Sequence, residues 1–480
     1  MKKILLCLLI STPIFAQKLT LQQAIDMAKD NSPIAKQIRS NYQASKWTFE
    51  ATKANLKPQL ELTGVLPGFR RSINSITQPD GGLLFRPQSQ NFSNTTLTLS
   101  QNLLKTGGVV SVNSGVSRID LFGKNLSATG SFWNTSPLFI EFSQPLFRIN
   151  RTKWNWEQRQ IEFDGETRKQ LESLEDLSLS ITQKFFDLSI ASVQLKNAEY
   201  NLAINDTIYN ISKGRYGVGK IAENELLQVE LGLMNARNEV ERNKLLMLTS
   251  EKELQNLIGG SNGNKIEAIV PFVIPVFDPN VEKAVLEARN NRSDYKNLEL
   301  SENQARMNLR SAEISRRFSA DLNVSFGFNQ TNPNLGKALS DLQGSQMASV
   351  GLKVPIYNAG RNKAEVESAK NSLDATIENI KNQQNMIDLE VFNRVSEIKQ
   401  LKTSLLISAK TDTIAQKRYE VAKNRYLIGK IDITNLTIAQ QEKDQALLAY
   451  IQTLQQFWLA YFRLRRATLY DFVLDEKIKP

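Results

Sequence analysis

The residue types that carry out most enzyme chemistry are almost absent from this chain. Its 480 residues include no histidine and a single cysteine, Cys7, near the N-terminus. A Ser-His-Asp triad, a Cys/His metal site and a disulfide framework are therefore excluded. A hydrolase with paired carboxylates stays an alternative, but the acidic residues fall mostly on predicted long helices instead of in a cleft. We predict no enzyme activity, no cofactor and no metal site.

One short motif could bind phosphate. Residues 214–220 (GRYGVGK) fit the GxxxxGK part of a phosphate-binding loop. Ile221 stands where such a loop places the Ser or Thr that binds Mg²⁺, and the segment follows a predicted helix instead of a strand. We therefore interpret Gly219 as the glycine of a helix turn and predict no nucleotide binding.

The chain contains one unit twice. Residues 211–221 (ISKGRYGVGKI) recur as residues 421–431 (VAKNRYLIGKI), 210 positions later. Two further pairs have the same spacing, Pro145 with Pro355 and Arg151 with Arg361. Matched segments at one spacing indicate a tandem duplication, so the two halves should occupy equivalent places in the fold.

The opening helices of the two halves match at a different spacing. Ala24 and Ala28 correspond to Ala284 and Ala288, which lie 260 positions later. The change from 260 to 210 leaves about 50 extra residues in the first half, before Pro145. A larger surface loop and an added hairpin both fit such an insertion.

The N-terminus has the features of a secretory signal peptide. Residues 1–16 contain two lysines, the apolar run Ile4–Ile10 and a small residue, Ala16, at the predicted cleavage point. The formal net charge of +11 falls to +9 (11 − 2) without Lys2 and Lys3. Much of the basic excess alternates with glutamate, which indicates solvated helix surfaces, so we predict no nucleic-acid partner.

Alternating segments follow both opening helices. In Ala320–Phe328 every second residue is apolar, and Val350–Ile356 repeats this pattern. The first half shows it less cleanly, at Leu60, Leu62, Leu97, Leu99, Ile140 and Phe142. Such strands fit a half-buried soluble sheet and a membrane barrel about equally. Nearby aromatic residues suit the interfacial girdles of a barrel: Phe69, Phe122, Phe132, Trp133, Phe139, Phe147 and Tyr357.

Long heptad patterns favour the membrane barrel over the soluble sheet. Apolar residues stand seven apart along one predicted helix at Leu174, Ile181, Leu188, Leu195, Leu202 and Tyr209, and along its return helix at Leu226, Leu233, Val240, Met247 and Leu254. The second half has Val391, Ile398, Leu405 and Tyr419, interrupted by Asp412, then Leu436, Tyr450, Phe457 and Leu464. Sustained heptads predict supercoiled helices. Sixty helical residues reach about 90 Å, which suits a tall hollow wall better than a small core.

These patterns predict a signal peptide at 1–16, a first repeat at 17–260, a crossover linker at 261–279 and a second repeat at 280–480. The first repeat comprises a helix at 18–57, a strand and loop region at 58–148, and long helices at 150–213 and 222–258. The second comprises a helix at 280–317, a strand region at 319–357, long helices at 360–424 and 432–468, and a C-terminal tail.

The order of these features resembles the TolC-like outer-membrane efflux proteins, the exit channels of tripartite efflux and type I secretion systems. The resemblance rests on the signal peptide, the duplication, the strand ends at Gln144–Phe147 and Val354–Tyr357, and the Arg-Tyr-x-x-Gly turns. It implies a mainly helical trimer with membrane strands, in which each protomer gives four strands to a twelve-stranded barrel and long antiparallel coiled-coil helices to a periplasmic tunnel. The strands of one protomer would leave open edges in lipid, so closure by oligomerisation is also expected physically.

The resemblance also implies where the tunnel narrows and where an adaptor binds. It places both functions at the two helix turns, so the candidate contacts are Arg215, Tyr216 and Gly219 with their repeats Arg425, Tyr426 and Gly429. Acidic residues after these turns often constrict the pore in the family. Glu225 fits that position, whereas its counterpart is Asn435 and the nearest acid is Asp432. The alternative interpretations are a helical hairpin that needs a glycine and a solvent-exposed glutamate.

The sequence therefore predicts a passive exit duct in the Gram-negative outer membrane that extends into the periplasm. Its expected partners are two further copies of the chain, outer-membrane lipid, a periplasmic adaptor and, through the adaptor, an inner-membrane pump or ABC transporter. The alternative is a periplasmic coiled-coil scaffold without channel activity. It explains the heptads but leaves the alternating, aromatic-rich strands unexplained.

Overall fold

The structure is a computed structural model that describes residues 17–122, 130–260 and 265–479. The predicted signal peptide lies outside the described residues. The chain forms two compact units. The first, the helical unit, comprises residues up to 44, 165–295 and 383 onward, and the second, the sheet unit, comprises residues 45–164 and 296–382. No helix among the described residues is long and apolar enough to cross a membrane.

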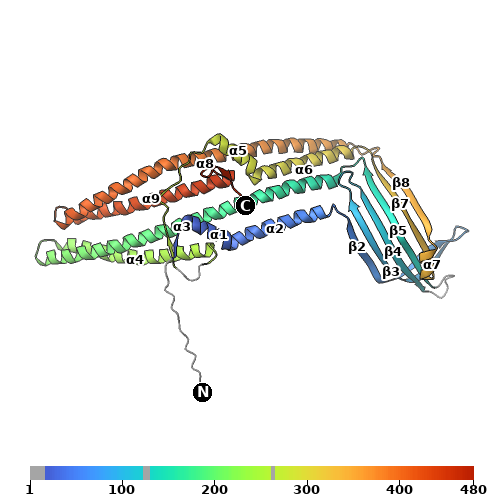
Figure 1. The fold of residues 1–480 in the computed structure, drawn as a ribbon, viewed down its shortest axis with the longest axis horizontal. Helices are drawn as coiled ribbons and strands as arrows, with labels where there is room; N and C mark the ends of the chain where they lie inside the picture. Colours follow the sequence, from blue (N-terminus) through green and yellow to red (C-terminus); the bar gives the residue numbers. More distant parts are fainter. Residues whose placement is uncertain (1–16, 123–129, 261–264, 480) are drawn as a thin grey trace, which may run out of the picture. The chain divides into compact units, whose positions relative to one another are not determined.

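Two very long helices contribute to both units, α3 (Arg151–Gly217) and α8 (Arg361–Leu427). Each is followed by a return helix, α4 (Glu223–Leu257) or α9 (Ile433–Thr468), as Figure 1 shows. In the helical unit the heptad residues of these helices are buried or partly buried. Phe185, Phe186 and Phe457 are the largest fully buried side chains of the core. The seven-residue spacing therefore marks the packed face, as expected.

Short elements complete the helical unit. Strand β1 (Gln17–Leu19) pairs in parallel with β6 (Ile266–Ala268), which lies within the stretch predicted as a crossover linker. Helix α1 (Leu21–Asn31) and helix α5 (Val281–Asn291) lie 260 positions apart, as the duplication predicts. The C-terminal tail forms a small antiparallel pair, β9 (Tyr470–Asp471) with β10 (Glu476–Lys477).

The predicted opening helices, 18–57 and 280–317, are each broken in two. Helix α1 ends before Ser32, and α2 (Pro33–Ala54) then begins. Pro33 disfavours a helical conformation of the residue before it, so Ser32 is extended (φ −65°, ψ 147°). The Ser32 hydroxyl accepts the N–H of Ala35 at 2.9 Å and so caps the new helix. The prediction of one continuous helix was wrong here because Pro33 breaks it.

The second repeat breaks at the equivalent residue without a proline. Arg292 is extended (φ −68°, ψ 145°), and α6 (Ser293–Ser315) follows it. The buried carboxylate of Glu172 on α3 accepts both the N–H and the hydroxyl of Ser293, each at 2.8 Å. This carboxylate satisfies a buried amide that a helix start leaves without an intrahelical partner. The break therefore depends on a residue 121 positions away.

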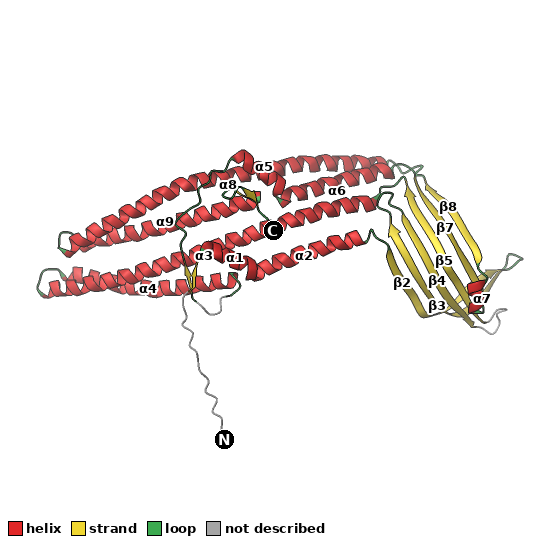
Figure 2. Ribbon diagram, in the orientation of Figure 1, coloured by secondary structure: helices red, strands yellow, loops and turns green. Residues whose placement is uncertain are grey.

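The sheet unit contains an antiparallel sheet of six strands in the order β2-β3-β4-β5-β7-β8, shown in yellow in Figure 2. Their bounds are β2 Gln59–Thr77, β3 Leu83–Asn102, β4 Val109–Phe122, β5 Gly130–Leu146, β7 Ser319–Asn332 and β8 Gln343–Lys353. Helix α7 (Leu335–Ser340) lies between β7 and β8 in sequence. The β5–β7 pair joins the two repeats.

The expectation of four strands per protomer was therefore wrong. The first half supplies four strands and the second half supplies two. The extra residues of the first half form an added hairpin, one of the two arrangements that fit the insertion. A strand pair satisfies the backbone N–H and C=O groups of such a long segment, whereas a loop would leave many of them to solvent.

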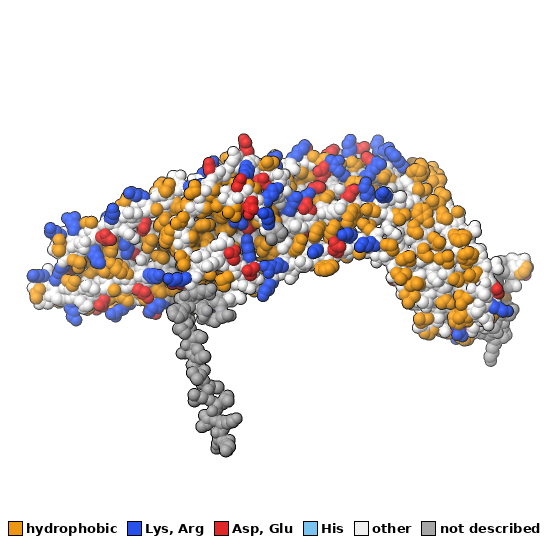
Figure 3. All heavy atoms as spheres, in the orientation of Figure 1, with side chains coloured by type: hydrophobic (Ala, Val, Ile, Leu, Met, Phe, Trp, Pro, Cys, Tyr) orange, Lys and Arg blue, Asp and Glu red, His pale blue; other side chains and the backbone are white. Residues whose placement is uncertain are grey.

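The two faces of the sheet differ in chemistry. One face presents exposed apolar side chains that continue across neighbouring strands: Leu60, Leu62, Leu97, Leu99, Ile140, Val324, Phe326, Val350 and Leu352. Figure 3 shows many hydrophobic side chains, in orange, over the sheet. The other face carries small polar residues at the intervening positions, among them Thr96, Asn113 and Ser325. A soluble sheet buries its apolar face, whereas this one leaves it exposed.

Candidate functional site: the helix turns and the polar hollows

The two long helices end in identical turns. After α3 the N–H of Gly219 bonds the carbonyl of Tyr216 and that of Lys220 bonds the carbonyl of Arg215, both at 2.9 Å. After α8 the N–H groups of Gly429 and Lys430 bond the carbonyls of Tyr426 and Arg425, again at 2.9 Å. This pair of bonds is the Schellman motif, which satisfies the last carbonyls of a helix.

The motif explains why both repeats carry glycine at this point. Gly219 has φ +68° and Gly429 has φ +74°, a left-handed conformation that costs other residues about 1–2 kcal/mol. A Cβ atom at either glycine would meet no other atom within 4 Å. The requirement is therefore one of backbone conformation and not of space.

The tyrosines at the turns differ between the repeats. Tyr426 is 3% exposed and belongs to a second apolar cluster with Ile208, Val229, Tyr419, Ile433 and Leu436. Its counterpart Tyr216 is 42% exposed. The guanidinium of Arg215 lies 5.9 Å from the centre of the Tyr426 ring, a cation–π contact that joins the two turns. Of the predicted contact residues, Arg215 and Tyr426 therefore meet, while Tyr216 and Arg425 face solvent.

The acidic candidates have different surroundings. Asp432 is the N-cap of α9, where its carboxylate accepts the N–H of Asn435 at 2.8 Å and a second bond from the Asn435 amide. Asp432 and Asn435 thus cap a helix together. Glu225 lies in the first turn of α4 and is partly buried, and among the described residues no side chain forms an ion pair with it. Its position at a helix N-terminus is electrostatically favourable.

A polar cluster above the turns was not predicted. Tyr200 on α3 accepts a hydrogen bond from Lys423 on α8 at 3.2 Å, and this bond lowers the pKa of Tyr200. Lys443 on α9 lies over the rings of Tyr200 and Tyr419, at 5.2 and 4.7 Å from their centres. Burial raises the pKa of Tyr419. Tyr419 in the heptad row was the available signal, but its partners Tyr200 and Lys443 come from two other helices, α3 and α9.

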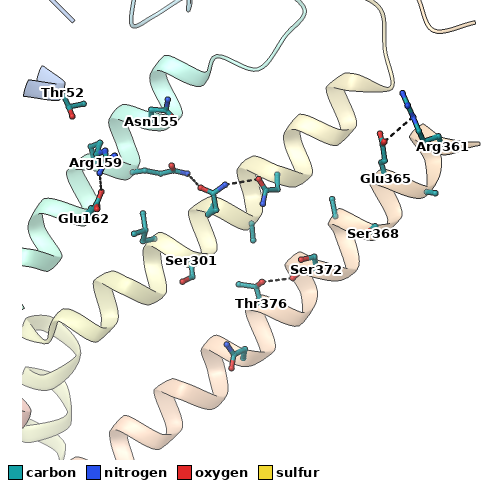
Figure 4. A pocket seen from close by; sticks show the side chains of 18 residues that line it. Thr52, Asn155, Arg159, Glu162, Ser301, Arg361, Glu365, Ser368, Ser372 and Thr376 are labelled. Atoms are coloured by element: carbon teal, nitrogen blue, oxygen red, sulfur yellow. Dashed lines mark hydrogen bonds and ion pairs between the residues drawn. The ribbon is translucent and has the colours of Figure 1, made fainter. Parts of the chain in front are cut away.

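The sheet unit contains a large polar hollow, shown in Figure 4. Its volume is about 1420 Å³, and residues of α2, α3, α6 and α8 line it. Amides and hydroxyls dominate the wall. Gln158 donates to Gln304, which donates to Asn308, at 2.9 and 3.0 Å. The charged residues pair with each other, Arg159 with Glu162 and Arg361 with Glu365, so the wall is charge-balanced.

A second hollow of about 590 Å³ lies against the polar face of the sheet. Asn94 and Thr96 of β3, Asn113 and Ser117 of β4, and Asn134 of β5 are among the residues that line it. Glu141 is its charged residue and accepts hydrogen bonds from Ser111 and Asn113. Short neutral polar side chains of this kind interact with water without holding an ion strongly.

The two hollows are polar and, in the part of the chain that the structure describes, carry few charges without a partner. Among the described residues, no group of three or more His, Cys, Asp and Glu side chains could hold a metal ion. The hollows offer hydrogen bonds to water and solutes. The turns offer exposed backbone, tyrosine and arginine for contact with another protein.

Comparison with known proteins identifies related sequences. A family model described as Outer membrane efflux protein matches residues 110–260 and 284–468. A curated relative, the Toxin and drug export protein A of Aggregatibacter actinomycetemcomitans, is 22% identical over 362 residues, which cover 74% of this chain and 73% of that protein.

Solved structures share the fold. The Campylobacter jejuni CmeC outer membrane channel superposes with a TM-score of 0.67 at 16% identity, covering 96% of this chain and 87% of the channel. The open state of the Neisseria gonorrhoeae MtrE outer membrane channel gives a TM-score of 0.63 at 16% identity, covering 96% and 91%. At such low identity the likeness establishes the fold alone.

Proposed function

This chain belongs to the outer membrane efflux protein family, and we propose that it is the exit duct of a tripartite efflux or secretion system. It is a transport protein of the outer membrane. In the proposed role it forms a passive channel through the outer membrane and the periplasm. The cargo is not changed chemically, and an inner-membrane transporter supplies the energy.

The observation that carries the proposal is the two-faced sheet. Its exposed apolar face suits lipid, and its polar face bounds a hollow that suits water. Strands β2 and β8 each have one partner among the described residues, so the sheet has two free edges. Lipid does not tolerate unpaired backbone groups, so these edges need partners from other copies.

Three copies would close the sheet through a β8–β2 seam. The even number of strands makes this seam antiparallel, like the pairs within the sheet. If Leu62 of one copy faces Val350 of the next, apolar side chains that are 67% and 63% exposed meet on the same face. Six strands per copy then give eighteen, with a diameter of about 36 Å between backbones, against about 24 Å for twelve strands.

The helical unit also presents faces that a second copy fits. On α8 an exposed row stands seven apart: Ile407, Ile414, Val421 and, beyond the helix end, Ile428. On α4 an exposed stripe includes Leu227, Leu231 and Met234. Heptad rows of this kind pack against another helix. We assign these two faces to each other across the boundary between copies.

The partner sites follow from the turns. The periplasmic adaptor would contact the exposed residues Tyr216 and Arg425 and the open backbone at Gly219 and Gly429. The Arg215–Tyr426 contact would hold the two hairpins of a copy together at the constriction. Glu225, which has no ion-pair partner in the described part of the chain, would face the pore there.

Bilayer conductance and disulfide trapping test the proposal together. Current steps from a purified trimer are expected. Leu62→Cys combined in turn with Ala348→Cys, Val350→Cys or Leu352→Cys should give covalent trimers, because these positions share a face. Leu62→Cys with Gly351→Cys is the matched control, since Gly351 lies on the opposite face. A protein that stays soluble and never inserts would overturn the duct and favour the scaffold.

A further inference from the structure

We propose that the duct carries anionic solutes, which a collar of cations recognises where the helices meet the sheet. This inference rests on the proposed function and names its class of cargo. The collar consists of Arg148, Arg151, Arg317, Lys353 and Arg361. They line a hollow of about 830 Å³ in the sheet unit.

The collar is assembled from separate elements. Arg148 follows β5, Arg151 and Arg361 begin α3 and α8, Arg317 follows α6, and Lys353 ends β8. The chain thus brings five cations to one hollow from segments that are up to 213 positions apart. Like charges repel one another, so such a convergence costs stability unless an anion offsets it.

The cations exceed the available carboxylates. Arg148 pairs with Asp321 at 2.8 Å and Arg361 with Glu365 at 3.5 Å. Among the described residues, no carboxylate pairs with Arg151, Arg317 or Lys353. Five cations and two carboxylates leave a charge of +3 per copy (5 − 2). The large helical hollow, in contrast, is charge-balanced.

The helix starts are an unusual place for arginine. A cation in the first turn opposes the helix dipole, whose N-terminal end is positive. Neither α3 nor α8 has an acidic residue in its first turn. Arg151 and Arg361 are equivalent in the duplication, so the same unfavourable choice occurs in both repeats. Departures from a local rule of this kind are expected where a residue serves function.

The collar faces the same side as the polar hollows. Lys353 and Ser319 are paired across strands, and they lie on the polar face of the sheet together with Glu141 and Ser325. Arg361 and Glu365 line both the collar hollow and the large helical hollow, so the two spaces adjoin each other. Because the apolar face is the opposite one, the anion is a water-soluble solute and not a lipid headgroup.

The chemistry of the collar selects the ligand. Guanidinium groups bind phosphate, sulfate and carboxylate through paired hydrogen bonds, and the lysine adds a point charge. Rings of Arg and Lys are the means by which pores favour anions. In three copies the excess positive charge would reach nine. This charge would concentrate anions where the helices meet the sheet, and the attraction would weaken as salt rises.

Binding of tripolyphosphate to the purified full-length protein in detergent tests this. Titration calorimetry at low salt should detect binding that weakens as salt is raised. The triple variant Arg151→Gln, Arg317→Gln, Lys353→Gln should have an affinity at least about tenfold lower. A loss of this size is expected when one or more charge-assisted hydrogen bonds are removed. The control variant Lys46→Gln, Lys53→Gln, Arg306→Gln removes the same charge from α2 and α6, outside the hollows, and should bind like the original protein.

Absence of binding at millimolar tripolyphosphate would overturn the collar, and so would equal binding by the two triple variants. Conductance of the same preparations separates this outcome from failure of the duct. A protein that conducts without binding tripolyphosphate retains the proposed function and loses the collar. A protein that binds it only at the collar residues but never conducts retains the anion site and loses the duct.

Discussion

Replacing Tyr426 by alanine should loosen the helix turns, and its repeat partner provides the matched control. Tyr426 is 3% exposed, packs in the second apolar cluster and carries Arg215 over its ring. Truncating a buried aromatic side chain costs about 3–5 kcal/mol. We expect the lower limit, about 3 kcal/mol, because this cluster lies near a helix end. Tyr216→Ala removes a side chain that is 42% exposed, so about 0.5 kcal/mol or less is expected.

Amide hydrogen exchange on the full-length protein measures this local difference. A loss of 3 kcal/mol raises the open population by about 100-fold, so exchange should accelerate by that factor in the last turn of α8 and the first turn of α9. Tyr216→Ala should change exchange in the α3–α4 turn by about twofold or less. Equal acceleration by the two variants would refute the argument, because burial of Tyr426 would then contribute nothing.

Three further predictions concern stability. Gly429→Ala should lower the thermal midpoint through a cost of about 1–2 kcal/mol at its positive φ, whereas Gly217→Ala, at the last residue of helix α3, should not; equal effects would contradict the backbone argument. Glu172→Ala should cost about 1–3 kcal/mol because the N–H of Ser293 loses its acceptor, and chemical denaturation would reveal it; a cost near zero would mean that water replaces the carboxylate. Burial, with Asp388 nearby, raises the pKa of Tyr295 to about 12. The stability that protonated Tyr295 contributes is therefore fully present below about pH 10 and is lost as pH rises through about 12. Tyr295→Phe should flatten this part of the plot of unfolding free energy against pH, and an unchanged plot would contradict the assignment.

Features that repeat along the sequence could be predicted from it. The glycine turns follow from two matched segments, because the same residues at the same spacing close the same Schellman motif. The heptad rows identified the packed faces of the long helices, because a seven-residue period keeps one side of a helix against its neighbour. Alternation located strands in both halves, although Val354 and Ile356 lie beyond the end of β8.

Features that depend on distant partners could not be predicted in this way. The break at Arg292 needs the carboxylate of Glu172, which no local pattern indicates. The burial of Tyr426 and the exposure of Tyr216 follow from packing between hairpins, which identical motifs do not distinguish. The number of strands depended on whether the inserted residues pair with the sheet, and both a loop and a hairpin fitted their length.

The two repeats differ at the helix turns but keep the same residue at the start of the long helices. At the turns Tyr426 of the second repeat is buried and lies under Arg215 of the first, whereas Tyr216 of the first repeat stays exposed. At the collar both repeats keep an arginine at the start of the long helix, Arg151 and Arg361. A trimer would therefore place six arginines around the neck in nearly equivalent positions, with the other collar cations between them. Packing tolerates divergence between repeats, whereas a ring of charge that acts on cargo from all sides requires that both repeats supply it.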